Sequence, residues 1–101
     1  MARLDVYPMP GTGPRGYVLD VQAKLLDHLA TRVVVPLLPL AAAPKPIQDL
    51  NPVFAVDGVQ HVMVTQAIAS IPAKELRGAV VSLDREHDQV TRALDVLFLG
   101  H

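Results

Sequence analysis

Short apolar runs, separated by residues that favour turns, make up most of the chain before residue 82. Alternating apolar and polar positions, or clusters of β-branched residues, are typical of strands. We therefore predict strands at residues 4–6, 17–21, 32–35, 53–56, 59–64 and 79–81, and a short extended or turn segment at 68–72. Asp57-Gly58 favours a type I′ hairpin turn, because both residues tolerate positive φ. Pro36 and Pro39 donate no backbone hydrogen bond, so the strand before them is expected at a sheet edge or to bend there.

The apolar period changes from strand-like to helical near the end of the sequence. The spacing i, i+3, i+4 and i+7 is followed by Val90, Ala93, Leu94 and Leu97. This spacing predicts an amphipathic helix that packs one side against the sheet. Ser82 or Asp84 is the expected N-cap, and Gly100 stands where a helix ends in left-handed geometry. Single helical turns are expected within residues 24–29 and 73–77. The pattern predicts a mainly β fold, a twisted antiparallel sheet or open barrel with a C-terminal helix.

Two segments rich in proline, glycine or alanine are predicted loops. Residues 8–16 contain three prolines and three glycines, and residues 41–46 follow the proline-rich strand. A loop longer than a tight hairpin turn is often functional, although a mobile connector has the same composition. Both interpretations of the first loop remain open.

Composition limits the fold to one domain and narrows the classes of partner. The chain has 101 residues, half of them apolar, with no cysteine and a formal net charge of −1. One domain over residues 1–101 is expected, and no cluster of Lys and Arg indicates strong binding to nucleic acid. Residues 33–73 carry only three charges, which fits a buried sheet centre or an apolar face for a partner. No run is apolar enough to span a membrane and no signal peptide is visible, so we expect a cytoplasmic protein.

No arrangement of residues indicates an active site. The four histidines lack a second ligand at metal spacing, and no serine lies in a nucleophile motif. A phosphate-binding glycine loop is also absent. We therefore expect a binding protein without metal or cofactor, not an enzyme. If Leu97 and Phe98 face the core, Leu99 points elsewhere. It then packs on its own domain or a dimer mate, or it enters a partner's pocket.

Several segments, in the order of the chain, together form a specific pattern. They are residues 17–22, with Asp-Val-Gln after an apolar pair, residues 32–37, Asn51-Pro52-Val53 with its hairpin, residues 63–65 and 69–72, and residues 93–101. In this order they resemble the CcdB family of bacterial toxins, over residues 4–101.

The resemblance implies an SH3-like barrel with a C-terminal helix and a homodimer whose tails lie close together. It implies the toxin of a toxin–antitoxin pair, which binds the DNA gyrase A subunit and traps gyrase on cleaved DNA. A CcdA-like antitoxin is the implied second partner. Operator DNA is contacted only through the toxin–antitoxin complex, which represses its own operon.

The resemblance also implies site residues. Leu99, Gly100 and His101 occupy the gyrase-binding tail, where the family's gyrase poison has Trp-Gly-Ile. The antitoxin surface falls on two loops, at Pro10, Gly11, Thr12, Gly13, Ala43 and Lys45.

Departures from the family's pattern leave two alternatives. Leucine replaces tryptophan at 99, histidine replaces isoleucine at 101, and His87 stands where a glutamate is expected. One alternative is a dimer that binds antitoxin but has lost gyrase poisoning. The other is a toxin of the same barrel type that cleaves messenger RNA, against which the near-neutral charge argues.

Overall fold

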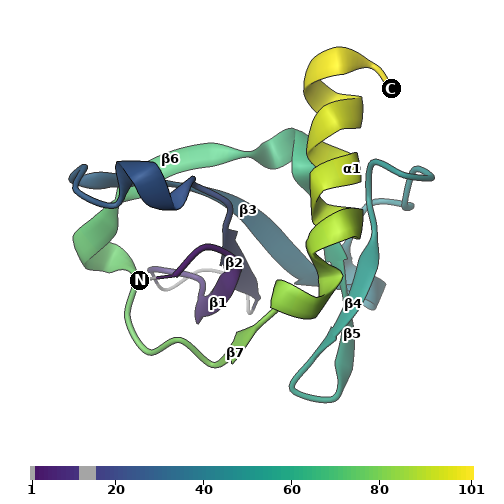
Figure 1. The fold of residues 1–101 in the computed structure, drawn as a ribbon. Helices are drawn as coiled ribbons and strands as arrows, with labels where there is room; N and C mark the ends of the chain where they lie inside the picture. Colours follow the sequence, from purple (N-terminus) through teal and green to yellow (C-terminus); the bar gives the residue numbers. More distant parts are fainter. Residues whose placement is uncertain (1, 12–15) are drawn as a thin grey trace.

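A computed structural model describes residues 2–11 and 16–101. Within them, an antiparallel sheet curls almost into a barrel and one helix packs across it, which confirms the predicted mainly β, SH3-like barrel with a C-terminal helix (Figure 1). The strands are β1 (Asp5–Pro8), β2 (Tyr17–Asp20), β3 (Thr31–Pro39), β4 (Val53–Val56), β5 (Val59–Met63), β6 (Ala69–Pro72) and β7 (Val81–Ser82), and the helix is α1 (His87–Leu99). Short 3₁₀ turns are η1 (Lys24–Leu26), η2 (Leu40–Ala42), η3 (Thr65–Ala67), η4 (Ala73–Glu75) and η5 (Asp84–Glu86).

The central strand is β3, so of the two alternatives predicted for it, an edge position or a bend at the prolines, the edge position is wrong. The strand order is β4-β5-β3-β2-β1-β7, and β6 also pairs with β3. Along one side β3 pairs with β2; along the other it pairs first with β6 and then with β5. Pro36 stands at this change of partner, where its carbonyl accepts the Val64 N–H at 2.9 Å. A residue without an N–H is tolerated there because the ladder is already interrupted.

Along the neighbouring strands β1, β2 and β3, successive residues face two separate cores on the two sides of the sheet. Val6, Leu19 and Val35 belong to the larger core, which Val90 and Ala93 of α1 cover. The neighbouring residues Tyr7, Val18 and Val34 belong to a smaller core on the other face, closed by Leu76. Because both faces are covered, these strands read as almost continuous apolar runs.

The hairpin was predicted correctly, whereas several strand boundaries differ from those predicted, among them the boundaries of β1, β3 and β7. Asp57 and Gly58 both have positive φ, 52° and 76°, as a type I′ turn requires. Leu4 also has positive φ, 71°, so the first strand begins only at Asp5. The last strand is Val81–Ser82 and not residues 79–81.

Helix α1 confirms the amphipathic prediction but not its cap. Val90 and Ala93 are fully buried, and Leu94 and Leu97 are half-buried. The helix begins at His87 with Glu86 as N-cap, and no side chain caps it. The Ser82 hydroxyl instead accepts the Asp84 N–H at 3.1 Å in η5, one turn earlier. No helix of the described residues has the length and apolar character to cross a membrane.

Candidate functional site

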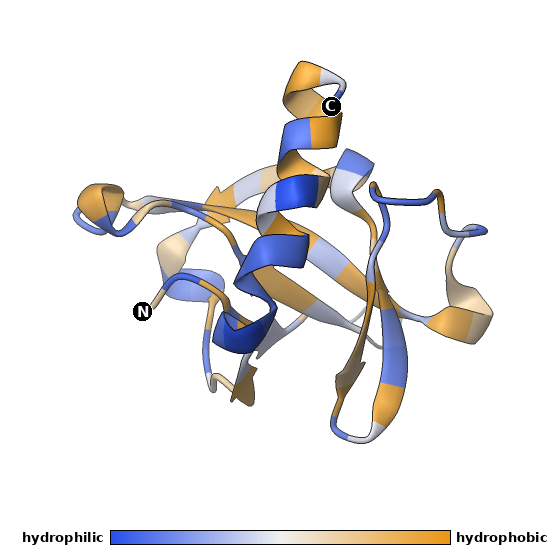
Figure 2. Cartoon of the chain, turned by 45° about the vertical axis from the view of Figure 1, so that its right-hand side comes forward, coloured by the Kyte–Doolittle hydropathy of each residue, from blue (hydrophilic) through white to orange (hydrophobic). Residues whose placement is uncertain are grey.

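The last turn of α1 carries apolar side chains that the domain does not cover. Phe98 is 66% exposed and Leu99 is 62% exposed. Figures 1 and 2 show the end of the helix standing clear of the sheet, with its last turn apolar. Phe98 therefore does not face the core with Leu97, so the condition from which the orientation of Leu99 was inferred is not met. Leu99 is nevertheless exposed, and has Phe98 as an exposed neighbour.

Gly100 fixes the direction of the chain after this apolar turn. Its φ is 81°, and its N–H donates to the carbonyls of Asp95 and Val96 at 3.2 and 3.1 Å. This is the left-handed helix end that was predicted. This geometry ends the helix directly after Leu99. The tail residues Leu99, Gly100 and His101 are all exposed.

The predicted antitoxin residues lie on two separate segments. Pro10 is half-buried and Gly11 is exposed after β1, while Thr12 and Gly13 lie outside the described residues. Ala43 is half-buried and Lys45 is exposed after η2. Of the six, Gly11 lines a surface hollow and the other described residues do not. The assignment of these loops to an antitoxin stays a prediction.

A buried ion pair between Arg32 and Asp20 holds in place the turn that carries the exposed Leu25. Arg32 on β3 is 1% exposed, and its Nη2 lies 2.6 Å from Oδ2 of Asp20 on β2, which is fully buried. Burial raises the pKa of Asp20, although Arg32 opposes that rise. The Arg32 Nη1 also contacts Asp27 at 2.7 Å, just after η1. This contact anchors the turn that displays Leu25, which is 85% exposed.

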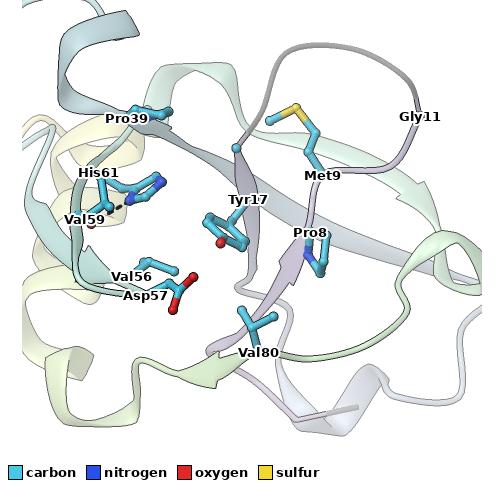
Figure 3. Close-up of a pocket in the computed structure, with 11 residues that line it drawn as sticks. Pro8, Met9, Gly11, Tyr17, Pro39, Val56, Asp57, Val59, His61 and Val80 are labelled. Atoms are coloured by element: carbon cyan, nitrogen blue, oxygen red, sulfur yellow. Dashed lines mark hydrogen bonds between the residues drawn. The ribbon is translucent and has the colours of Figure 1, made fainter.

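Sequence reasoning did not predict a hollow between the β4–β5 hairpin and the first loop. It has a volume of about 540 Å³, and Tyr17, Asp57 and His61 are the polar side chains that line it (Figure 3). His61, expected to be satisfied or half-exposed, is buried and hydrogen-bonded. These residues come from β2 and the β4–β5 hairpin, so only the sheet register brings them together. Among the described residues no group of three potential metal ligands occurs.

The model of the family described as "CcdB protein" matches residues 3–100. The chain belongs to the CcdB family. Membership places it among the toxins of toxin–antitoxin systems. The expectation drawn from the sequence segments is thereby confirmed at the level of the family.

Two solved structures have a similar fold at low sequence identity. One is described as an "Endoribonuclease in complex with its cognate antitoxin from Mycobacterial species"; it is 16% identical with a TM-score of 0.78, covering 98% of this chain and 96% of that one. A second, "Mycobacterium tuberculosis toxin MazF-mt6", is 13% identical with a TM-score of 0.73, covering 93% of this chain and 95% of that one. At these identities the likeness establishes the fold alone.

Proposed function

We propose that this CcdB-family protein is a non-enzymatic toxin that acts in the cytoplasm by binding the A subunit of DNA gyrase. In this proposal, bound toxin holds gyrase on cleaved DNA. The protein works as a homodimer, a CcdA-like antitoxin neutralises it, and the toxin–antitoxin complex represses its own operon.

The observation that carries the proposal is the uncovered apolar turn at Phe98 and Leu99, 66% and 62% exposed. Large apolar side chains that stand together on an exposed helix end favour insertion into a partner's pocket. Gly100 supports this role, because its left-handed backbone ends the helix directly after Leu99, which leaves Leu99 on the last helical turn. These features suit the tail to apolar contact with a partner.

Leucine at position 99 changes the kind of contact that the tail makes. A leucine side chain has no π face, so it cannot stack on a guanidinium as an indole does. The lost cation–π attraction is worth on the order of 1–2 kcal/mol per subunit. Phe98, which is also exposed, offers an aromatic ring one residue earlier. We propose that the two side chains together fill the gyrase pocket by apolar packing.

The test compares Leu99→Ser with Ile47→Ser, a matched control. Ile47 is also a large apolar residue, 55% exposed, and lies in the loop after η2. Purified gyrase, supercoiled DNA and toxin are incubated, and the cleaved DNA that remains bound to gyrase is quantified. The wild type and Ile47→Ser should accumulate cleaved DNA, whereas Leu99→Ser should lose roughly tenfold in potency. Equal potency of all three proteins contradicts the role of the tail.

The main alternative is a CcdB-like dimer that binds antitoxin but no longer binds gyrase. The replacements at Leu99 and His101 favour it. It predicts that expression without antitoxin leaves growth unchanged, while an antitoxin peptide still binds the purified dimer. Growth arrest that a gyrase A mutation relieves excludes this alternative.

The antitoxin and the homodimer are tested separately from gyrase. Sedimentation equilibrium should give twice the mass of the 10.9 kDa chain. An antitoxin tail peptide should then protect loop amides near Pro10, Gly11, Ala43 and Lys45 from hydrogen exchange. Protection elsewhere on the surface contradicts the assignment of these two loops.

A second candidate function is cleavage of messenger RNA. The likeness to the endoribonuclease toxin, with a TM-score of 0.78, favours it. The net charge of −1 argues against it, since nucleic-acid binding surfaces are usually basic. Incubation of the purified protein with a long RNA in the absence of gyrase decides between them, because only this candidate predicts defined cleavage products.

A further inference from the structure

A hollow lies at the end of the molecule opposite the helix terminus. Its walls come from residues 8, 9, 11 and 16 beside the first loop, from β2, from the end of β3, from the β4–β5 hairpin and from the segment before β7 (Figure 3). The hairpin turn and the end of α1 lie at opposite ends in Figure 1, so this surface is distinct from the apolar tail. Its volume of about 540 Å³ falls within the range of ligand sites. A smaller hollow of about 290 Å³ shares Tyr17, Asp57 and Val80 with it.

The imidazole of His61 is held so that one ring nitrogen is an acceptor. Its Nδ1 lies 2.7 Å from the Val59 carbonyl oxygen. A carbonyl oxygen only accepts, so Nδ1 carries the hydrogen and the neutral ring keeps a lone pair on Nε2. Nε2 makes no hydrogen bond with any described residue, and Figure 3 shows it turned toward the space between Pro39 and Tyr17. Tyr17 packs edge-to-face on the imidazole, with ring centroids 5.2 Å apart.

Two more polar groups converge on the same opening. Figure 3 shows the Tyr17 hydroxyl turned toward the Asp57 carboxylate. No hydrogen bond among the described residues uses either group. The remaining described lining residues are apolar or glycine, and none of them is Lys or Arg. A carboxylate and a neutral imidazole nitrogen both accept hydrogen bonds, so the hollow offers acceptors beside apolar walls.

We propose that this hollow binds a short peptide segment of a partner protein, through an arginine side chain and an adjacent apolar residue. The guanidinium donates to Asp57, to His61 Nε2 and to the Tyr17 hydroxyl, and lies against the aromatic pair. The apolar neighbour packs on the walls that Met9, Pro39 and Val80 form. A nucleic acid is disfavoured, because its phosphates meet Asp57 and no cation among the described lining residues. The site does not depend on gyrase binding.

Charge, shape and apolar packing are separated by a set of three tripeptides. The probes are acetyl-Leu-Arg-Leu-amide, the same peptide with citrulline, which keeps the shape of arginine without its charge, and acetyl-Leu-Glu-Leu-amide. Each is titrated into the ¹⁵N-labelled protein, and amide shifts are followed at Gly58, Val59 and Val80. The arginine peptide should give saturable shifts there. The citrulline peptide should bind roughly three- to fivefold more weakly, as expected for a partly exposed ion pair, and the glutamate peptide should bind more weakly still.

Two variants and one control assign the contacts. Asp57→Asn preserves the hairpin, because asparagine tolerates positive φ, and should remove the difference between the arginine and citrulline peptides. Tyr17→Phe keeps the ring against His61 and should weaken binding of both peptides. Asp88→Asn removes an exposed carboxylate on α1 and should leave all affinities unchanged.

Three outcomes overturn the proposal. The first is the absence of saturable shifts with the arginine peptide. The second is an Asp57→Asn protein that still distinguishes arginine from citrulline. The third is a single-stranded RNA oligonucleotide that shifts the same amides more strongly than the peptide.

Discussion

Replacing Arg32 with methionine removes one partner of a fully buried ion pair. Arg32 donates from Nε and Nη2 to one oxygen of Asp20, at 3.0 and 2.6 Å, and both side chains are at most 1% exposed. Methionine fills similar volume but leaves the Asp20 carboxylate without a countercharge. The other Asp20 oxygen still accepts the Gln22 N–H at 3.0 Å, so part of its solvation remains.

The expected loss of stability in Arg32→Met follows from the burial of Arg32 and Asp20. Breaking a buried pair by removing one partner costs about 3–5 kcal/mol in the free energy of unfolding. The second contact, to Asp27, adds less than about 1 kcal/mol because Asp27 is 39% exposed. A total of this size is a large share of the roughly 5–15 kcal/mol that holds a small domain folded. Arg32→Met should therefore be only marginally stable.

Urea unfolding followed by circular dichroism, at one fixed protein concentration, measures the loss. The control is Arg92→Met, which breaks an exposed pair with Asp49 and should cost under about 1 kcal/mol. The double variant Asp20→Asn/Arg32→Met should recover part of the stability, because it removes the unpaired charge.

The dependence of the stability of Arg32→Met on pH provides a second measurement. Burial raises the pKa of Asp20 and Arg32 opposes that rise, so the pKa rises further in Arg32→Met. A carboxyl whose pKa is raised in the folded state favours folding at low pH, and that contribution is lost as pH rises through the folded value. Arg32→Met should therefore be less stable at pH 8 than at about pH 5. A loss no greater than that of Arg92→Met at either pH would show that the buried pair of Arg32 and Asp20 does not stabilise the fold.

Three further predictions concern single side chains. Burial, followed by the charge of Asp5, raises the pKa of Tyr7 above its usual value of 10.0. The neutral Tyr7 side chain therefore stabilises the fold fully below pH 10, and this contribution is lost as the pH rises through the folded-state pKa of Tyr7. Tyr7→Phe should therefore lose less stability than the wild type in urea unfolding between pH 8 and about pH 11. Gly16→Ala would place a Cβ 3.0 Å from the Leu37 carbonyl oxygen and should cost about 1–3 kcal/mol in the same assay, with an unchanged value contradicting the close packing. Gly100→Ala meets no atom within 4 Å, so only its φ of 81° opposes it; calorimetry should show a loss of about 1 kcal/mol, from strain alone.

Local patterns along the chain were sufficient to predict most of the elements. The Asp57-Gly58 turn, the buried side of α1 and the left-handed Gly100 each depend on a few neighbouring residues. The central position of β3 was not predictable in this way, because it depends on partners 14 or more residues away. Proline chemistry indicated an interruption at Pro36, and only the pairing shows that the interruption is a change of partner strand.

The same distinction applies to the candidate sites. Leu99 was singled out from the sequence, but whether its own domain covers it was left open, and only the structure shows that it is exposed. The hollow at Tyr17 and His61 was not predicted, since these residues meet only through the registers of β2 with β3 and of β3 with β5. The buried pair of Arg32 and Asp20 depends on the same pairing. Sequence reasoning placed both residues on strands and gave them no partner.

Calorimetric titration of this protein into the breakage–reunion fragment of gyrase A measures directly whether the toxin binds gyrase through its tail. The comparison protein lacks residues 99–101, and circular dichroism and sedimentation first establish that it is folded and has the same oligomeric state. The wild type should bind tightly at one toxin dimer per fragment dimer, and the truncated protein should give no heat. Absence of binding by the folded wild-type dimer, or undiminished binding by the truncated protein, contradicts binding through the tail.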